Sequence, residues 1–234
     1  MKKYLLLFAL SVTTLTSCDQ KTLDAVLNSS GVLSDADISK GLKQALEKGV
    51  DNSVTYLAKE GGYYQSVYKI LLPAEAQMVT SKLRVIPGFG NLEEEVVKRI
   101  NKAAEDAASK AGPIFLNAIT QMTFADVRNI LMGEKNAATS YLQRVTYAAL
   151  YDEFKPVVVG SLNKFGALDY WGNAINSYNK IPFVDKVNPD LADHVTNNAL
   201  KGLFALIEQK ELGIRTDISQ RTSDLLKKVF AKQD

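Results

Sequence analysis

The chain has 234 residues, 46% of them hydrophobic, and a chain of this length can bury a large core in one domain without disulfides or structural metals. Its 28 Lys and Arg residues nearly balance its 26 Asp and Glu residues, which gives a formal charge of +2. Because the basic residues do not cluster, the sequence lacks the pattern of a nucleic-acid-binding protein, and we exclude that class.

Residues 1–17 have the pattern of a removable secretory signal. Lys2 and Lys3 precede an apolar run from Tyr4 to Val12. This run is far shorter than the ~20 residues that cross a bilayer as a helix, and a basic start followed by a short apolar centre is typical of a cleaved signal peptide. Its removal would leave a mature chain with equal numbers of basic and acidic residues.

The signal ends in Leu15-Thr16-Ser17-Cys18, which resembles the lipobox of bacterial lipoproteins. The resemblance implies cleavage after Ser17 and lipid attachment to Cys18, the only cysteine in the sequence. Several acyl chains hold a protein stably at a membrane, since each buried methylene contributes about 0.8 kcal/mol. We therefore expect a lipid-anchored protein of the cell envelope, in the outer membrane rather than the inner one. The sequence does not distinguish the periplasmic face of the membrane from the cell-surface face. The alternative is a secreted protein with a free thiol.

Residues 18–33 are predicted to form a lipidated tether, and residues 34–232 a helical domain of unknown function. As a flexible coil, the tether would span ~20 Å and hold the domain just clear of the lipid headgroups. Within the domain, apolar residues recur at three- and four-residue steps, which is typical of amphipathic helices. The predicted fold class is therefore all-α, a compact single-domain bundle of several helices.

The expected helices follow one another with few breaks. The first begins after Ser34, a typical helix cap, and ends at Gly61-Gly62. The others are expected at 74–85, 91–111, 114–122, 124–132, 137–154, 190–207 and 225–230. We also expect caps at Asn91 and Thr123, a stop or kink at Gly112-Pro113, and a helix start at Asn188-Pro189. The best candidate for a strand is Pro156-Val157-Val158-Val159, and residues 160–188 have the least regular pattern.

Phrases spread along the domain match, in order, a family of bacterial proteins. They are Leu33-Ser34, Gly41-Leu42-Lys43, Asn101-Lys102-Ala103-Ala104-Glu105, Pro113-Ile114-Phe115, Met122-Thr123-Phe124, Ala137-Ala138-Thr139, Phe154-Lys155-Pro156, Tyr178-Asn179-Lys180-Ile181-Pro182-Phe183, Val187-Asn188-Pro189-Asp190-Leu191, Gly202-Leu203-Phe204, Ile214-Arg215 and Arg221-Thr222. Together they resemble the uncharacterised family known as domain of unknown function 4197, over nearly all of residues 33–231. The resemblance implies a helical domain in the envelope and brings no established activity, substrate or catalytic residue.

Polar residues within the matching phrases form the main candidate site. They are Asn101, Glu105, Thr139, Arg215 and Arg221. Asn101 and Glu105 are four residues apart and share one helix face. One interpretation is a pocket in which they converge with an arginine on a small polar or anionic ligand. The other, which we prefer, is a structural network, because buried polar groups must be paired whether or not they act on a ligand.

Two further sets of polar residues are weaker candidates. Glu211 and Arg215 form an i,i+4 pair, with Glu208 nearby, and a solvated helix face is the preferred interpretation. His194 is the only histidine. Leu191 stands where a Glu-x-x-His metal motif would need glutamate, so a surface or capping role is preferred for His194. No glycine loop that cradles phosphate occurs either, and we predict no metal and no cofactor.

Aromatic residues in the least regular part of the domain could bind a partner or simply pack a loop against the core. They are Tyr170, Trp171, Tyr178 and Phe183, and packing is the preferred interpretation. The same choice applies to Tyr63, Tyr64 and Tyr68.

The function that these observations favour is a non-enzymatic lipoprotein. It would be held at a membrane by its N-terminal lipid, and its helical domain would bind or scaffold a protein, glycan or lipid partner of the envelope. One alternative is a hydrolase or transferase that uses a carboxylate such as Glu105 with Arg215 or Arg221. Another is a carrier of apolar ligands, which needs a cavity of ~300 Å³ or more.

Overall fold

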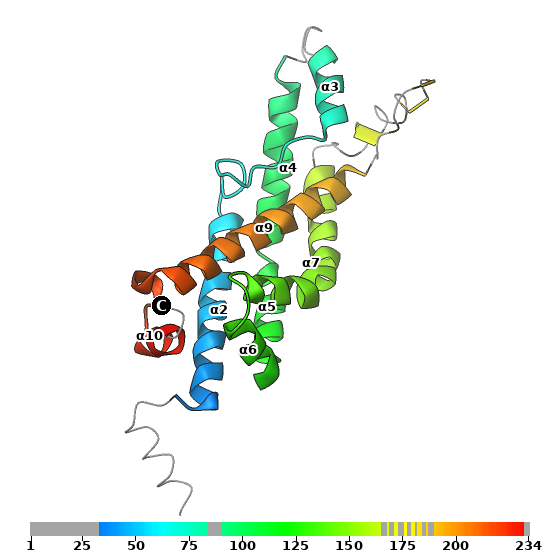
Figure 1. The fold of residues 1–234 in the computed structure, drawn as a ribbon. Helices are drawn as coiled ribbons and strands as arrows, with labels where there is room; N and C mark the ends of the chain where they lie inside the picture. The colour runs from blue at the N-terminus through cyan, green and yellow to red at the C-terminus, as the bar shows by residue number, and fades with distance from the viewer. Residues whose placement is uncertain are drawn as a thin grey trace, which may run out of the picture.

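A computed structural model describes residues 33–83, 90–164, 168, 171–172, 176, 179–180, 182–183, 186 and 190–231. Within these ranges the regular structure is helical and contains no strand, which confirms the all-α prediction. The helices pack against one another around a shared apolar core (Figure 1). The predicted signal, Cys18 and most of the tether lie outside the described residues.

The first described helix, α2, spans Asp35–Ala58 and begins as the sequence predicts. Ser34 and Asp37 form a capping box, in which each side chain bonds to the other residue's backbone N–H and so satisfies amides that the first turn leaves unpaired. The helix ends slightly before the predicted Gly61-Gly62. The chain then turns through Gly61, whose φ of 75° favours glycine.

Four helices follow: α3 (Ala74–Leu83), α4 (Leu92–Ala108), α5 (Ala111–Thr120) and α6 (Phe124–Leu131). The predicted break at Gly112-Pro113 occurs two residues earlier, so Pro113 lies in the first turn of α5, where its missing N–H costs no hydrogen bond. Asn91 precedes α4 but makes no capping bond with its side chain. Thr123 caps α6 through a capping box with Asp126, as predicted.

Helix α7 spans Ala137–Asn163 and is longer than predicted. The best candidate for a strand, Pro156–Val159, is helical, because α7 continues through Pro156. The reason is a stripe of fully buried side chains at four-residue steps that runs past the proline. Its members are Leu150, Phe154, Val158 and Leu162. Burial of this stripe outweighs the local preference of proline and the valine run for a non-helical backbone.

The longest C-terminal element is α9 (Leu191–Thr216), which crosses the bundle and packs on α7, α2 and α4 (Figure 1). Asp190 caps it; the predicted start at Asn188-Pro189 lies outside the described residues. Phe204 of α9 meets Phe115 of α5 edge to face, with ring centroids 5.7 Å apart. A short 3-10 turn, η1 (Ile218–Gln220), leads to α10 (Asp224–Phe230), which packs on α2.

Close packing between α2 and α10 depends on Gly41. A Cβ added at Gly41 would lie 2.7 Å from Cγ2 of Val229. We expect Gly41→Ala to lower the free energy of unfolding by ~1–2 kcal/mol, because the cost of overpacking exceeds the gain in helix propensity. Urea denaturation measures this change.

Gly160 in α7 provides the matched control, since no atom lies within 4 Å of a Cβ added there. We expect Gly160→Ala to raise the free energy of unfolding by ~0.5–1 kcal/mol. If both substitutions stabilised the protein equally, α10 would not be packed on α2 as described.

Candidate functional site

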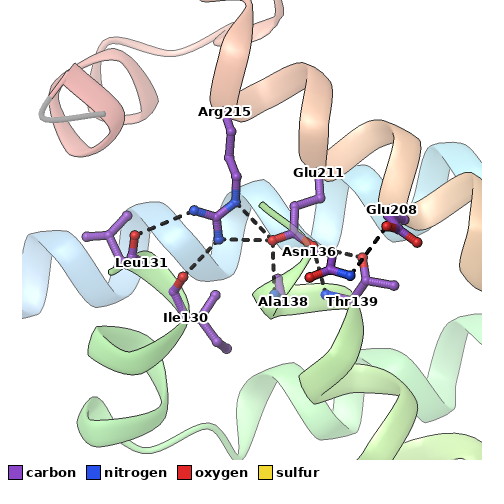
Figure 2. A network of polar contacts seen from close by, with 8 residues as sticks. All are labelled: Ile130, Leu131, Asn136, Ala138, Thr139, Glu208, Glu211 and Arg215. Carbon is purple, nitrogen blue, oxygen red and sulfur yellow. Dashed lines mark hydrogen bonds and ion pairs between the residues drawn. The ribbon is translucent and has the colours of Figure 1, made fainter. Parts of the chain in front are cut away.

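Glu211 and Arg215 of α9 form a buried ion pair in which Arg215 Nε and Nη2 both lie 2.9 Å from Glu211 Oε1. Their relative exposures are only 8% and 6%. The preferred interpretation of a solvated helix face is therefore wrong for these two residues, although Glu208 is exposed. Burial follows from tertiary packing, because α9 lies over the connection between α6 and α7 (Figure 2).

The Glu211 carboxylate caps the start of α7. Its Oε1 accepts from the Ala138 N–H at 2.9 Å, and its Oε2 accepts from the N–H and the hydroxyl of Thr139, both at 2.8 Å. Asn136, the residue before α7, makes no capping bond of its own. A carboxylate from a neighbouring helix thus satisfies amides that the first turn leaves unpaired, and it lies at the positive end of the helix dipole.

The Arg215 guanidinium caps the end of α6 in the same way. Its Nη2 donates to the carbonyl of Ile130 at 2.8 Å, and its Nη1 lies 3.5 Å from the carbonyl of Leu131 (Figure 2). One ion pair therefore closes the last turn of α6 and the first turn of α7. A positive charge is favourable at a helix C-terminus and a negative one at an N-terminus.

Arg221 performs a related task at the end of α9. It is 1% exposed, and its guanidinium donates to the carbonyls of Ile214 and Arg215 at 3.0 Å. It also lies 5.9 Å from the ring centroid of Phe230 in α10. The final turn of α9 and the final helix are thereby tied together.

A second buried network holds the segment between α2 and α3. Asn101 of α4 exchanges two hydrogen bonds with Ile70: its Oδ1 accepts from the Ile70 N–H and its Nδ2 donates to the Ile70 carbonyl, both at 2.8 Å. Nδ2 also donates to the Val97 carbonyl at 2.7 Å. Because the carboxamide uses both its donors and an acceptor lone pair, Asn101 fixes the backbone of this segment.

Glu105, one turn further along α4, holds the start of the same segment. Its Oε1 lies 3.3 Å from the backbone nitrogen of Tyr63 and 3.5 Å from that of Tyr64. Burial raises the pKa of Glu105, against the effect of these N–H groups and of Lys102. Burial, together with the charge of Glu105, also raises the pKa of Tyr63, so its phenol remains protonated and donates to the Ala199 carbonyl at 2.8 Å.

The family model described as "Protein of unknown function (DUF4197)" matches residues 32–231. The chain belongs to this family. A search of curated proteins found no match, and a search of solved structures found none either. The matched range covers every helix from α2 to α10, so both buried networks belong to the DUF4197 domain.

The five predicted polar residues of this DUF4197 domain are all buried but do not form one cluster. Thr139 and Arg215 meet through Glu211, and Arg221 bonds to the Arg215 carbonyl. Asn101 and Glu105 instead bond to the segment 61–70 and to their own helix. The two groups thus hold different parts of the chain, and their geometry fits the structural interpretation.

A polar ladder between α7 and α9 was not predicted. Three α7 side chains four residues apart reach three side chains near the start of α9; the pairs are Tyr147 with Asn197, Tyr151 with Asp193, and Lys155 with Asp190. Hydrogen bonds to Asp190 and Tyr151 raise the pKa of Lys155. The four-residue spacing is the signal that could have revealed this face, but it does not identify the partner helix.

A cleft of about 600 Å³ lies between the segment 67–74 and α9. The α9 residues that line it include His194, Asn198 and Lys201. His194 Nε2 donates to the Leu71 carbonyl at 2.9 Å, which places the only histidine in a contact with the backbone of the segment. Among the described residues, no group of three or more His, Cys, Asp or Glu side chains is placed to hold a metal ion.

The predicted aromatic residues differ in their surroundings. Trp171 is buried in the core, as a packing role requires, whereas Phe183 is fully exposed. Tyr170 and Tyr178 lie outside the described residues. Tyr63 is completely buried.

Arg215→Met tests the ion pair that caps α6 and α7. The substitution keeps the apolar stem but leaves the Glu211 charge buried without its partner, which costs ~3–5 kcal/mol of unfolding free energy. Lys227→Met is the control, because Lys227 pairs with Asp224 at an exposed site, where ion pairs contribute little. Urea denaturation should separate the two variants clearly, and equal losses would contradict the burial of the pair.

Glu105→Gln tests the raised pKa of Glu105. A carboxyl whose pKa is higher in the folded chain contributes most to stability below its unfolded value of 4.5, and this contribution is lost as pH rises through the folded pKa. Glutamine keeps an acceptor for the Tyr63 N–H and does not titrate. The unfolding free energy of the variant, relative to the wild type, should therefore rise as pH increases above 4.5.

Glu94→Gln, also in α4, is the control, because the pKa of Glu94 is shifted in the opposite direction. The hydrogen bond from Lys98, and its charge, lower the pKa of Glu94, so wild-type Glu94 contributes stability above its unfolded pKa and loses it as pH falls. Relative to the wild type, this variant should become less stable as pH rises. If the unfolding free energies of both variants, relative to the wild type, changed with pH in the same direction, the raised pKa of Glu105 would be contradicted.

Proposed function

We propose that this protein is a lipid-anchored envelope protein whose helical domain binds or scaffolds a partner and does not catalyse a reaction. The proposal rests on what the buried polar side chains bond to, which is the backbone of the protein itself. Glu105 holds the backbone of Tyr63 and Tyr64, and Glu211 and Arg215 cap α7 and α6. These groups build the framework of the domain.

The geometry does not support a hydrolase or transferase that uses Glu105 with an arginine. General acid–base catalysis needs reacting groups within hydrogen-bond reach of one another or of one substrate. Glu105 is engaged by the turn after α2, whereas Arg215 and Arg221 bond to backbone at the ends of α6 and α9. Each group belongs to a separate helix contact.

The apolar pocket between α2, α9 and α10 does not support a ligand carrier. Its volume is about 20 Å³, which holds about one water molecule, far less than the ~300 Å³ of a typical ligand cavity. The open cleft beside residues 67–74 is much larger. A binding role is therefore better supported than a carrier role.

The anchoring part of the proposal rests on the sequence Leu15-Thr16-Ser17-Cys18. No helix in the described ranges has the length and apolar character needed to span a bilayer. The first described helix begins at Asp35, so a lipid on Cys18 would be joined to it by a short tether.

Metabolic labelling with an alkyne analogue of palmitate tests the anchor. The wild-type chain, expressed in a bacterium that processes lipoproteins, should incorporate the label and fractionate with membranes. Cys18→Ser should lose the label and leave the membrane fraction. Ser17→Ala is the matched control and should still be labelled, because it keeps a small residue beside the cysteine.

Two outcomes would contradict the proposal. The first is Cys18→Ser protein that stays in the membrane together with wild-type protein that takes up no label. The second is turnover of a substrate by the purified protein that Glu105→Ala abolishes.

A further inference from the structure

A groove of about 240 Å³ lies between α2 and α5, which pack against each other (Figure 1). Its apolar lining comes from both helices and consists of Val50, Val54, Leu116 and Ile119. Val50 and Ile119 belong to the buried core, whereas Leu116 is 53% exposed. The groove therefore connects the apolar core of the bundle with an apolar side chain at the surface.

The α2 side of the groove carries negative charge. Its lining includes two carboxylates, Glu47 and Asp51, which are exposed and, being four residues apart, lie on one face of the helix. No described lysine or arginine lines the groove, and α5 contains no charged residue. The groove thus combines an apolar floor with an acidic rim.

The lysines nearest to these carboxylates along α2 are engaged elsewhere. Lys43, one turn before the first carboxylate, donates to the Thr120 carbonyl at 2.9 Å. Lys48, three residues before the second, donates to the Thr222 hydroxyl at 2.6 Å. Neither carboxylate has a hydrogen bond or ion pair with a described residue. Two like charges one turn apart on a helix repel each other, so cations of a partner would relieve this repulsion.

The size of the groove favours the side chains of a partner helix as its occupants. Its volume is below the ~300 Å³ of typical small-molecule sites. Along α2 it extends from Glu47 to Val54, about 10 Å at 1.5 Å per residue. Residues on a third helix repeat at the same rise, so two lysines four residues apart match the spacing of Glu47 and Asp51. A groove between two packed helices is also where the side-chain ridges of a further helix can fit.

We propose that the groove between α2 and α5 binds an amphipathic helix of a partner protein that carries lysine or arginine beside its apolar face. The apolar side chains enter the groove over Val54 and Leu116, and the basic side chains contact Glu47 and Asp51. Apolar residues at i, i+3, i+4 and i+7 anchor helices in grooves of this kind, while charge complementarity fixes their register and selects the partner. The same carboxylates repel anionic lipid headgroups, which favours a protein partner over a membrane surface. The inference rests on the proposed binding function and names a site and the class of its partner.

Fluorescence anisotropy of the full chain in zwitterionic detergent micelles, with empty micelles as the blank, tests the inference with defined probes. The first probe is an end-blocked, fluorescein-labelled alanine-based peptide of about 18 residues, long enough to form a helix in water. One face carries two leucines four residues apart, and two lysines four residues apart lie beside them. We expect this lysine peptide to bind.

Three altered peptides separate the contributions. One has glutamate in place of the lysines, one has alanine in place of the leucines, and one has proline at its centre. We expect each to bind at least about tenfold more weakly than the lysine peptide, because it loses the charge match, the apolar anchors or the helix respectively.

Variants of the protein locate the site. Glu47→Lys should weaken binding of the lysine peptide by about tenfold or more and improve binding of the glutamate peptide. Glu153→Lys, at another exposed carboxylate in the interior of a helix, is the matched control and should leave binding unchanged.

Gly112→Trp tests the space inside the groove. Gly112 lines the groove, and no atom lies within 4 Å of a Cβ added there. The indole ring would therefore occupy this space and weaken binding of the lysine peptide by about tenfold or more. Gly160→Trp is the matched control, because a Cβ added at Gly160 is equally unobstructed and lies in α7. Thermal unfolding checks that each variant remains folded, which positions without steric conflict favour.

Four results would overturn the inference. They are the absence of binding by the lysine peptide, equal binding by the peptide without leucines, equal binding by the peptide with proline, and equal weakening by either control variant. The second would identify plain attraction between charges, and the third a site for a non-helical chain. Acyl labelling at Cys18 is measured separately, so failure of the anchor and failure of the groove are distinguishable.

Discussion

The arrangement of the helices depends most on the buried ion pair between Glu211 and Arg215. Burying two charges costs free energy that their attraction alone does not recover. Here the remaining hydrogen-bonding capacity of both groups is used on helix ends: the carboxylate accepts from two amides of α7, and the guanidinium donates to carbonyls of α6. The pair therefore satisfies backbone groups that would otherwise be buried without partners, and it fixes the direction in which the chain turns from α6 into α7.

Side chains of one helix also hold a non-helical segment in a second part of the molecule. Asn101 and Glu105 of α4 bond to the backbone of the irregular segment after α2, and Tyr63 of that segment bonds to α9. Gly202 allows this approach, since a Cβ added there would lie 3.1 Å from the Tyr63 ring and 3.2 Å from Cβ of Tyr68. A non-helical segment is thus held in a helical bundle by polar contacts on one side and close packing on the other.

Much of the fold could be predicted from the sequence because it depends on local signals. Ser34 and Thr123 cap helices as predicted, and each forms a capping box with the aspartate three residues later. The continuation of α7 through Pro156 could not be predicted, since it depends on burial against other helices. The sequence also singled out five polar residues that turn out to be buried, but not their partners: Asn101, Glu105, Thr139, Arg215 and Arg221. Glu211 looks like half of a surface pair until α9 is placed over the start of α7.

The position of the cleft suits a protein held at its N-terminus. Helix α2 has 24 residues, so its two ends are about 36 Å apart at 1.5 Å per residue. The segment that walls the cleft follows the C-terminal end of α2, whereas a tether from Cys18 would enter at the N-terminal end. With a lipid on Cys18, α2 would act as a rigid spacer between the anchored end and the cleft. A partner could then reach the cleft without competing with lipid headgroups, because the length of one helix separates the cleft from the anchored end.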